Sequence, residues 1–487
     1  MRLKNMKNFI VLLFLFSCAA ALAPLQRGVL RAPPTPPGVK LPEPQWMVQY
    51  LDHFNKDSKT TWNQRYFTND SFWDKESGPV FLLLGGEGPD NPAWLVADTE
   101  IMINAQKFKA LVITIEHRFY GESHPTSDLS LSNMKYLSSR QALADVNYFI
   151  GVMTSMLKLT DKNRWVSFGG SYSGALSGWL RQLYPDKVVG AVATSAPVYA
   201  IEDFSQYLEV VSASLGSSSH GAECVNAIKE ATTQVDSWLG NKNTWSMAER
   251  TFNISPPLES EMDVALAAQN LAGNFMGVVQ YNKDNTAFEG RANNVTIEVL
   301  CSVMVNTELG SPVMRYAAVN KLMSGNESLD CNYKSLINEM STTDWSHPLV
   351  MGGARQWYYQ TCTEFGYFQT TDSTNQPFGK LISLLSYTDV CNQVFKIDAT
   401  AIKNAITSTN AHYGGRNVTG TKIVFPNGSI DPWHQLSVVN DISPSVRSFY
   451  IHGTAHCANM YPPSPQDPSE LTQARANITA AIGTWLQ

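Results

Sequence analysis

Short, unbroken runs of apolar residues recur along this 487-residue chain, and each run ends on glycine or on polar residues. A strand with no polar face must be covered on both sides, which is typical of a parallel sheet. Apolar residues at helical spacing between the second and third runs, from Leu143 to Leu157, predict a crossover helix. Strands that alternate with helices predict a doubly wound α/β core. The apolar runs are Val80–Leu84, Ala110–Ile115, Trp165–Phe168, Val189–Thr194, Lys422–Phe425 and Ser448–Ile451.

The segment that ends the third run carries the clearest chemical signal. It reads Phe-Gly-Gly-Ser-Tyr-Ser-Gly, with Ser171 in a glycine turn before a segment able to form a helix, Ala175–Tyr184. A nucleophile elbow has this arrangement, because a tight turn between a strand and a helix presents a serine hydroxyl above the sheet. A glycine turn with a structural serine is the alternative for this motif taken alone. The small residues that let the two backbones approach are Gly169, Ser173 and Gly174.

An elbow serine needs a base and an orienting acid, which follow it in the chain order Ser, Asp or Glu, His. Asp431 lies in the loop after the fifth run, and His456 lies well inside the loop after the sixth. His434 is too close to Asp431 in sequence to occupy a separate loop, and His452 lies at the strand edge. We therefore predict a catalytic triad of Ser171, Asp431 and His456.

Two alternative roles exist for these loop residues. His452 and His456 are four positions apart, and on a helix such a pair could bind a metal ion. Gly453 and the preceding strand place both histidines in a loop instead, so we expect no metal and no cofactor. Asp431 taken alone could also cap a helix or bind a turn.

The oxyanion of a tetrahedral intermediate needs N–H donors. The N–H of Tyr172, at the start of the helix after the serine, is placed to act as one. We expect the second from the glycine loop after the first run, at Gly86 or Glu87. The alternative for this loop is an ordinary exit from a strand, and the Glu87 carboxylate could also accept a substrate amine.

The alternation of strands and helices is interrupted from about residue 200 to residue 410. This stretch has helical patterning, for example at Met262–Val279, and contains most of the cysteines. We interpret residues 201–410 as a large, mainly helical insertion. The catalytic domain is then discontinuous and consists of residues 46–200 and 411–487.

The beginning of the chain predicts entry into the secretory pathway. Three basic residues precede an apolar run, Phe9–Ala23, that is shorter than the ~20 residues of a membrane-spanning helix. Small residues follow, so residues 1–23 read as a signal peptide, with an uncleaved anchor as the alternative. The prolines of residues 24–45 predict an extended leader or propeptide. No later stretch is long and apolar enough to span a membrane, so we expect a secreted protein or one of the endosomal or lysosomal lumen.

Composition and cysteines narrow the class of protein further. Lys and Arg number 36 against 42 Asp and Glu, for a net charge of −6, which argues against a nucleic-acid binder. No C-x-x-C motif is present, and cysteine spacing alone does not choose among the many disulfide pairings. In a secretory chain, several N-x-S/T sequons should carry glycan. They are Asn69, Asn253, Asn294, Asn326, Asn417, Asn427 and Asn477.

Longer motifs extend over the chain from about residue 46 to its end. They are Gln49–Asn55, Thr61–Phe67, Leu84–Gly88, Glu116–Gly121, Leu137–Asp145, Phe168–Tyr172, Gln356–Gly366 and Asn427–His434. With these motifs the chain resembles the prolyl serine exopeptidases, the family of the lysosomal Pro-Xaa carboxypeptidase and dipeptidyl peptidase type, and its thymus-type branch in particular.

The resemblance implies an α/β-hydrolase core with an inserted helical domain and a triad on the three residues predicted above. It also implies two disulfides, Cys224 with Cys301 and Cys362 with Cys391, and leaves the pairing of Cys331 and Cys457 open. The implied activity is that of a serine exopeptidase that cleaves a peptide substrate beside proline near one terminus, through an acyl-enzyme. A homodimer is left open. The alternatives are a carboxylesterase or lipase of the same fold and a non-catalytic binding protein.

Overall fold

The computed structural model describes residues 30–283 and 295–487 of the chain. The expected signal peptide (residues 1–23), the first part of the proline-rich leader and the Asn294 sequon lie outside the described residues. The described part of the leader has irregular backbone up to the first strand, which begins at Gln45. The regular fold therefore begins where the sequence predicts, next to Trp46.

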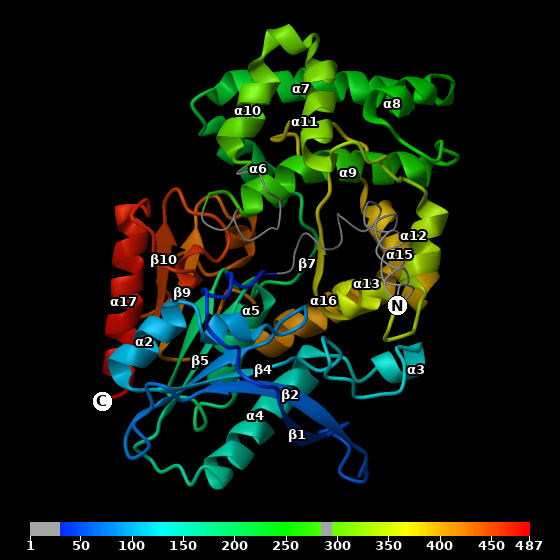
Figure 1. The fold of residues 1–487 in the computed structure, drawn as a ribbon. Coiled ribbons are helices and arrows are strands. Elements are labelled where there is room, and N and C mark those ends of the chain that lie inside the picture. The colour runs from blue at the N-terminus through cyan, green and yellow to red at the C-terminus, as the bar shows by residue number, and fades with distance from the viewer. Residues whose placement is uncertain (1–29, 284–294) are drawn as a thin grey trace, which may run out of the picture.

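A single large sheet forms the centre of the α/β part of the chain (Figure 1). Its eight strands, counted over the described residues, lie in the order β1-β2-β4-β3-β5-β6-β9-β10. Strand β2 runs antiparallel to β1 and β4, and all other neighbouring strands of the sheet are parallel. This is the sheet of an α/β-hydrolase fold, as the sequence predicts. The strands are β1 (Gln45–Tyr50), β2 (Thr61–Asn69), β3 (Val80–Leu84), β4 (Leu111–Ile115), β5 (Trp165–Gly170), β6 (Gly190–Thr194), β9 (Ile423–Gly428) and β10 (Val446–Ile451).

The six apolar runs of the sequence are the six strands from β3 to β10 in this sheet, with ends that differ by a few residues. Strands β1 and β2, at one edge, were not predicted. Residues along both of them alternate between buried and exposed for much of their length. Each therefore lacks the unbroken apolar run that marks a strand covered on both faces.

Helices cover both faces of the sheet (Figure 1). The helices α4 (Ser139–Met156) and α5 (Tyr172–Leu183) contribute to one apolar core, and α4 is the predicted crossover helix. The helices α2 (Glu100–Phe108) and α17 (Ser469–Trp485) contribute to a second core on the opposite face. A short helix, α3 (Leu131–Met134), precedes α4.

The segment between β6 and β9 is mainly helical. Its first helices, α6 to α11, lie together at the top of the molecule in Figure 1, away from the sheet. Two short strands, β7 (Ile201–Asp203) and β8 (Gly366–Phe368), pair in parallel and connect the beginning of this segment to its later part. The helices are α6 (Gln206–Gly216), α7 (Gly221–Leu239), α8 (Trp245–Phe252), α9 (Glu261–Gln280), α10 (Ile297–Val305), α11 (Pro312–Ser324), α12 (Tyr333–Met340), α13 (Pro348–Met351), α14 (Ala354–Gln360), α15 (Leu384–Phe395) and α16 (Ala399–Tyr413).

The last helix of the insertion packs on the catalytic domain. The ring of Tyr413, at the end of α16, stacks on the ring of Trp179 in α5, with centroids 3.8 Å apart. The helical segment thus continues shortly beyond residue 410, and its end is fixed by contact with the core.

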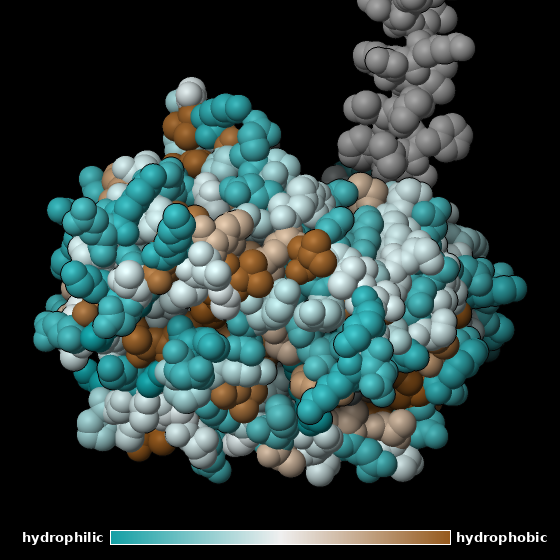
Figure 2. Space-filling view, turned by 90° about the horizontal axis from the view of Figure 1, so that it is seen from below, coloured by the Kyte–Doolittle hydropathy of each residue, from teal (hydrophilic) through white to brown (hydrophobic). Residues whose placement is uncertain are grey.

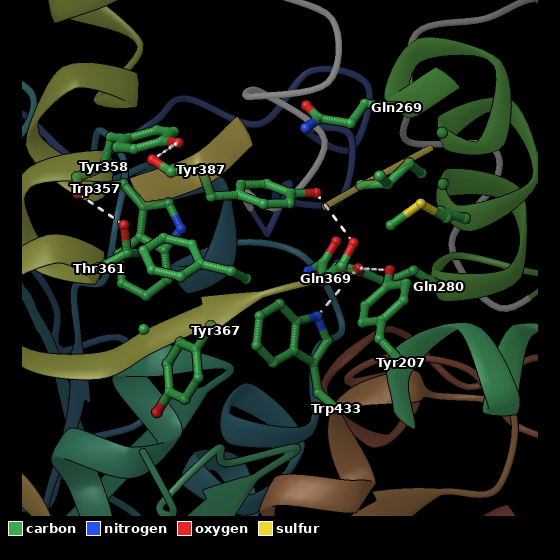
Figure 3. Close-up of a pocket in the computed structure, with 16 residues that line it drawn as sticks. Tyr207, Gln269, Gln280, Trp357, Tyr358, Thr361, Tyr367, Gln369, Tyr387 and Trp433 are labelled. Carbon is green, nitrogen blue, oxygen red and sulfur yellow. Dashed lines mark hydrogen bonds between the residues drawn. The ribbon is translucent and has the colours of Figure 1, made fainter. Parts of the chain in front are cut away.

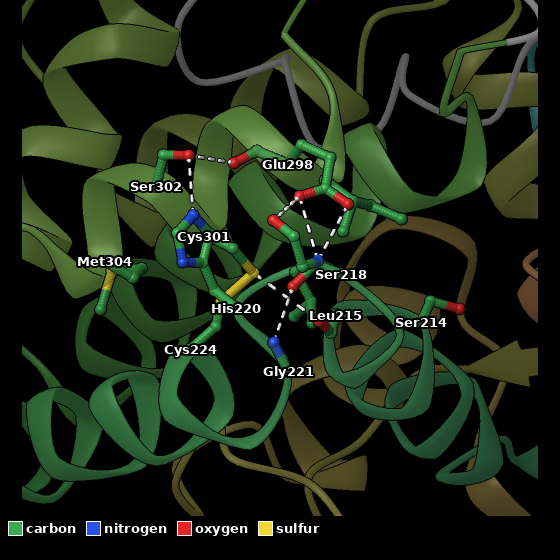
Figure 4. The surroundings of a disulfide bond; sticks show 12 residues. Ser214, Leu215, Ser218, His220, Gly221, Cys224, Glu298, Cys301, Ser302 and Met304 are labelled. Atoms are coloured by element: carbon green, nitrogen blue, oxygen red, sulfur yellow. Dashed lines mark hydrogen bonds between the residues drawn. A yellow bond between two sulfur atoms is a disulfide. The ribbon is translucent and has the colours of Figure 1, made fainter.

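Two disulfides cross-link the insertion. Cys224 of α7 is bonded to Cys301 of α10, and Cys362 is bonded to Cys391 of α15. These are the pairings that the resemblance implied. Figure 4 shows the first of them beside the hydrogen bond between His220 and Ser302, which joins the same two segments. Of the cysteines in the described residues, Cys331 and Cys457 remain buried thiols.

The sequons differ in accessibility. Asn253, Asn326 and Asn417 are exposed, and Asn69 and Asn477 are partly exposed.

The prediction of a glycan on Asn427 is corrected by the structure, because the side chain of Asn427 is buried in β9. Its amide nitrogen donates hydrogen bonds to the carbonyl oxygens of Phe425 and Val438. A glycan cannot be accommodated on this amide in the folded chain, so Asn427 is not a glycosylation site of the fold.

The surface seen from below in Figure 2 is mostly hydrophilic, with hydrophobic residues in separate patches. Over residues 30–283 and 295–487, the helices are either too short or too polar to cross a bilayer.

A buried ion pair connects the β1 edge of the sheet to α4. The guanidinium of Arg118 donates to both carboxylate oxygens of Asp145, at 2.6 and 2.7 Å, and also to the carbonyl oxygen of Leu51. The ring of His53 lies 2.7 Å from the same carboxylate. Burial opposes ionisation, but Arg118 and His53 outweigh it and lower the pKa of Asp145.

We predict that Asp145→Ala lowers the free energy of unfolding by about 4 kcal/mol, because it leaves the Arg118 cation buried without its counter-charge. Urea denaturation measures the loss. The control is Asp441→Ala, which removes the partner of Arg447 at 3.5 Å in a pair whose two side chains are both exposed and should cost less than about 1 kcal/mol. Equal losses in the two variants would contradict the assignment.

Candidate active site

The strand-to-helix turn after β5 has the strained backbone of an elbow. Ser171, between β5 and α5, has a φ of +60° and a ψ of −131°. Its N–H donates to the carbonyl oxygen of Thr194 on β6, and its own carbonyl oxygen accepts from Ala175. The helix begins at Tyr172, three residues before the predicted start at Ala175. The serine hydroxyl is therefore placed directly at a helix N-terminus.

Close backbone contact explains the small residues of the motif. A side-chain carbon on Gly169 would lie 2.0 Å from the carbonyl oxygen of Ser173, and one on Gly174 would lie 2.4 Å from that of Thr194. The hydroxyl of Ser173 closes the turn by bonding both the N–H and the carbonyl oxygen of Gly170. Larger residues at these positions would force α5 away from β5 and β6.

The loops after β9 and β10 bring an imidazole to a carboxylate. Nδ1 of His456 lies 2.9 Å from Oδ1 of Asp431, and both side chains are fully buried. The N–H of Ile430 donates to the carbonyl oxygen of Thr454, which holds the two loops together. Burial disfavours the imidazolium, but the adjacent Asp431 carboxylate raises the pKa of His456 above its ordinary value. A proton accepted by this ring is thus stabilised in place.

The other two histidines of this region have different partners. His452 is exposed and bonds the carboxylate of Glu470 at 2.9 Å. His434 bonds the main-chain oxygen of Asp431. His456 is therefore the histidine that contacts the Asp431 carboxylate. His452 and His456 do not converge on a common site.

The loop after β3 packs against the elbow and contributes a buried carboxyl group. A side-chain carbon on Gly86 would lie 3.4 Å from Cβ of Ser173. Glu87 is 6% exposed, and the Ser171 side chain and the His456 ring both lie close enough to influence the pKa of its carboxyl. Ser171 and His456, which are distant in sequence, therefore share Glu87 as a neighbour.

Three buried carboxyl groups of this region are held in their neutral form by their surroundings. Burial raises the pKa of Glu87 to about 7, and it does the same for Asp90 in the same loop and for Glu100 at the start of α2. The hydroxyl of Thr114 donates to Asp90, and the amide of Asn459 donates to Glu100, each at 2.6 Å. At the pH of an acidic vesicle all three groups are protonated in the folded chain.

The insertion reaches the histidine loop through the end of α9. The N–H of His456 donates to the carbonyl oxygen of Gln280 at 2.9 Å. The side-chain oxygen of Gln280 accepts hydrogen bonds from Tyr207 and from Trp433, the second residue after Asp431. The sequence alone did not predict a role for Gln280, since helical periodicity shows which face of α9 is buried but not which loop it meets.

A cavity of about 150 Å³ is lined in part by Gln280 and lies between α9 and the segment that contains α14 and β8 (Figure 3). Seven of its 16 lining residues are aromatic. The aromatic side chains are Tyr207, Trp357, Tyr358, Tyr367, Phe368, Tyr387 and Trp433. A cavity of this size is known to hold a molecule as large as benzene, so a five-membered ring fits within it.

Comparisons with known proteins agree with this architecture. The family model described as serine carboxypeptidase S28 matches residues 49–478. The human thymus-specific serine protease is 36% identical over 466 residues, which cover 93% of this chain and 88% of the relative, and its mouse counterpart is 35% identical over 462 residues, 92% of this chain and 88% of the relative. Human lysosomal Pro-X carboxypeptidase is 26% identical over 483 residues, 96% of this chain and 94% of the relative.

The buried carboxyls predict a fold that is more stable in acid. Glu87, Asp90 and Glu100 keep their protons up to about pH 7 when folded, whereas the unfolded chain loses them near its ordinary values of 4.5, 3.8 and 4.5. Unfolding therefore releases protons, and the free energy of unfolding falls by about 2 kcal/mol per group between pH 5 and pH 7.5. His117, whose pKa burial lowers to about 4, acts in the opposite sense, and His456 acts in the same sense as the acids.

We expect a lower unfolding temperature at pH 7.5 than at pH 5, measured by differential scanning fluorimetry. Glu100→Gln, which keeps an acceptor for Asn459 but cannot ionise, should reduce the difference between the two pH values. Glu76→Gln, at an exposed carboxylate, is the control and should leave it unchanged. A chain that is more stable at pH 7.5 would contradict the assignment.

Proposed function

The chain belongs to the serine carboxypeptidase S28 family and is a serine peptidase, and from this premise we propose that it is an exopeptidase that cleaves beside proline near a peptide terminus. The proposal is carried by the buried Asp431–His456 pair and is supported by the elbow conformation of Ser171, which has Glu87 as a neighbour in common with His456. The motifs that suggested a prolyl serine exopeptidase are thus those of a confirmed family member.

In the proposed mechanism, Oγ of Ser171 attacks the scissile carbonyl carbon while Nε2 of His456 takes the serine proton. Asp431 holds the ring by its Nδ1–H and stabilises the imidazolium. The main-chain N–H groups of Tyr172 and of Gly86 or Glu87 donate to the oxyanion. The assignment of Tyr172 is supported by the start of α5 at this residue, since the first N–H groups of a helix lack partners within it.

Collapse of the tetrahedral intermediate breaks the C–N bond, and His456 gives its proton to the leaving amine. The acyl group is then esterified to Ser171. Water attacks this ester with His456 again acting as the base, which releases the acid product and restores the serine.

The preference for proline is supported by the aromatic cavity beside Gln280. The ring of proline is apolar and rigid, and aromatic walls bind such a group without needing polar partners. The lysosomal relative is by its printed name a Pro-X carboxypeptidase, which is consistent with this use of the cavity. Restriction to a chain end follows from the insertion, because α9 and its C-terminal residues lie over the histidine loop.

An acidic lumen of the secretory pathway is the proposed workplace. The disulfides need an oxidising compartment to form. The neutral carboxyl groups near the site favour low pH, and the Pro-X carboxypeptidase relatives are lysosomal by name.

We predict that Ser171→Ala abolishes peptide cleavage, with a loss of at least about 1,000-fold in kcat/KM. The assay is mass-spectrometric profiling of a peptide library, with proline near either end, at pH 5 and pH 7. A fluorophosphonate probe should label the unmodified protein and the exposed-serine control Ser132→Ala, but not Ser171→Ala. Labelling without peptide cleavage, together with hydrolysis of acyl esters, would favour an esterase of the same fold. Absence of labelling in the folded protein would favour a non-catalytic binding protein.

The cavity makes a separate prediction. Gly277 of α9 lines it, so Gly277→Leu should fill part of it and raise KM for proline peptides by about tenfold. The rate of fluorophosphonate labelling, which does not need the cavity, should change less than twofold. Glu261→Leu, at an exposed position of the same helix, is the matched control. Equal KM values for Gly277→Leu and the unmodified protein would rule out the cavity as the proline site.

A further inference from the structure

The residue after the nucleophile is held by a glutamine of the insertion. The hydroxyl of Tyr172 lies 3.0 Å from Nε2 of Gln360, at the end of α14, and 3.0 Å from Nε2 of His117, in the loop after β4. All three side chains are buried, with at most 4% exposed. The first residue of α5 is thus clamped between the catalytic domain and the insertion.

The donors and acceptors of this cluster have one consistent assignment. Nδ1 of His117 lies 2.7 Å from the carbonyl oxygen of Arg118, so this nitrogen carries the proton and Nε2 accepts from Tyr172. The Tyr172 oxygen is then free to accept from Gln360. The hydroxyl of Tyr120 donates to Oε1 of Gln360 at 2.7 Å, which fixes the orientation of the amide. No bond of the cluster can be reversed without losing another.

A carboxylate anchors the glutamine from behind. Oε2 of Glu364, one turn further along, accepts from Nε2 of Gln360 at 2.9 Å. The same carboxylate accepts from both the N–H and the hydroxyl of Ser139, at the start of α4. Residues Thr361–Phe365 form a π-helical turn, and such turns are frequent at functional sites. Gln360 is therefore fixed against the core of the catalytic domain as well as against its own helix.

The residues of this cluster come from four of the sequence motifs, and three of these motifs contain no member of the proposed triad. The residues are His117 and Tyr120 of Glu116–Gly121, Ser139 of Leu137–Asp145, Tyr172 of Phe168–Tyr172, and Gln360 and Glu364 of Gln356–Gly366. These segments are far apart in the chain and meet at one point below the nucleophile.

We propose that Gln360 is a positioning residue for the peptidase reaction, acting through the Tyr172 hydroxyl on the main-chain N–H that follows Ser171. This inference rests on the proposed function, in which that N–H binds the oxyanion. Oxyanion donors act by being preorganised, so a small rotation of the first turn of α5 weakens stabilisation of the transition state more than binding of the substrate. The insertion is then a working part of the oxyanion site.

The test compares Gln360→Leu, Tyr172→Phe and the double variant. Active sites are counted by complete titration with a fluorophosphonate, and kcat is expressed per titrated site for a proline peptide and for p-nitrophenyl acetate. We expect each single variant to lose about tenfold in kcat with KM within twofold, less than the ~100-fold or greater cost of deleting a donor. The double variant should lose no more than the worse single variant, since both changes break the same bond.

The matched control is Gln182→Leu, which removes a hydrogen bond between the other end of α5 and the carbonyl oxygen of Tyr413 in the insertion. It should leave kcat per site unchanged. A merely structural role would lower the unfolding temperature or the number of titrated sites of the Gln360 and Tyr172 variants without changing kcat per site, and this result would overturn the proposal. Independent losses that multiply in the double variant would also overturn it. If proline peptides are not cleaved at all, the proposed function fails, while the ester assay still decides on Gln360.

Discussion

A single main-chain conformation constrains the whole site, the positive φ of Ser171. A residue with a side chain occupies this region at a cost of about 1–3 kcal/mol and stays there only when its surroundings enforce it. Enforcement comes from two sides. Gly169 lets β5 and α5 pack in backbone contact, and the clamp on Tyr172 holds the beginning of α5. Packing of the core thereby stabilises the main-chain conformation that keeps the Ser171 hydroxyl at the edge of the sheet.

The insertion takes part in the site at two points. Through Gln280 it receives the N–H of His456, and through Gln360 it bonds the residue that follows the nucleophile. The insertion is therefore not only a cover over the site. Each of the two contacts is a hydrogen bond between a buried group of the insertion and a loop or helix of the rest of the fold.

Much of this arrangement could be predicted from sequence, and the exceptions have physical reasons. The central strands and the Ser171 turn follow from local patterns, and the order of Asp431 and His456 after them follows from the topology of the sheet. Gln280 and Gln360 could not be assigned, since their partners depend on how the insertion docks. The burial of Glu87 against Ser171 likewise depends on loop packing. The three-residue sequon at Asn427 predicts an exposed site, whereas the position of Asn427 in β9 buries its side chain.

The depth of the proposed triad also limits which substrates the peptidase can reach. The imidazole and its carboxylate are shut off from bulk solvent, and the nucleophile is nearly so. Substrate size would therefore limit cleavage before side-chain preference does. An unfolded chain end is narrow enough to reach such buried groups, whereas the surface of a folded protein is not. Such an enzyme would leave the folded proteins of its compartment intact and would degrade the short peptides that less selective proteases produce.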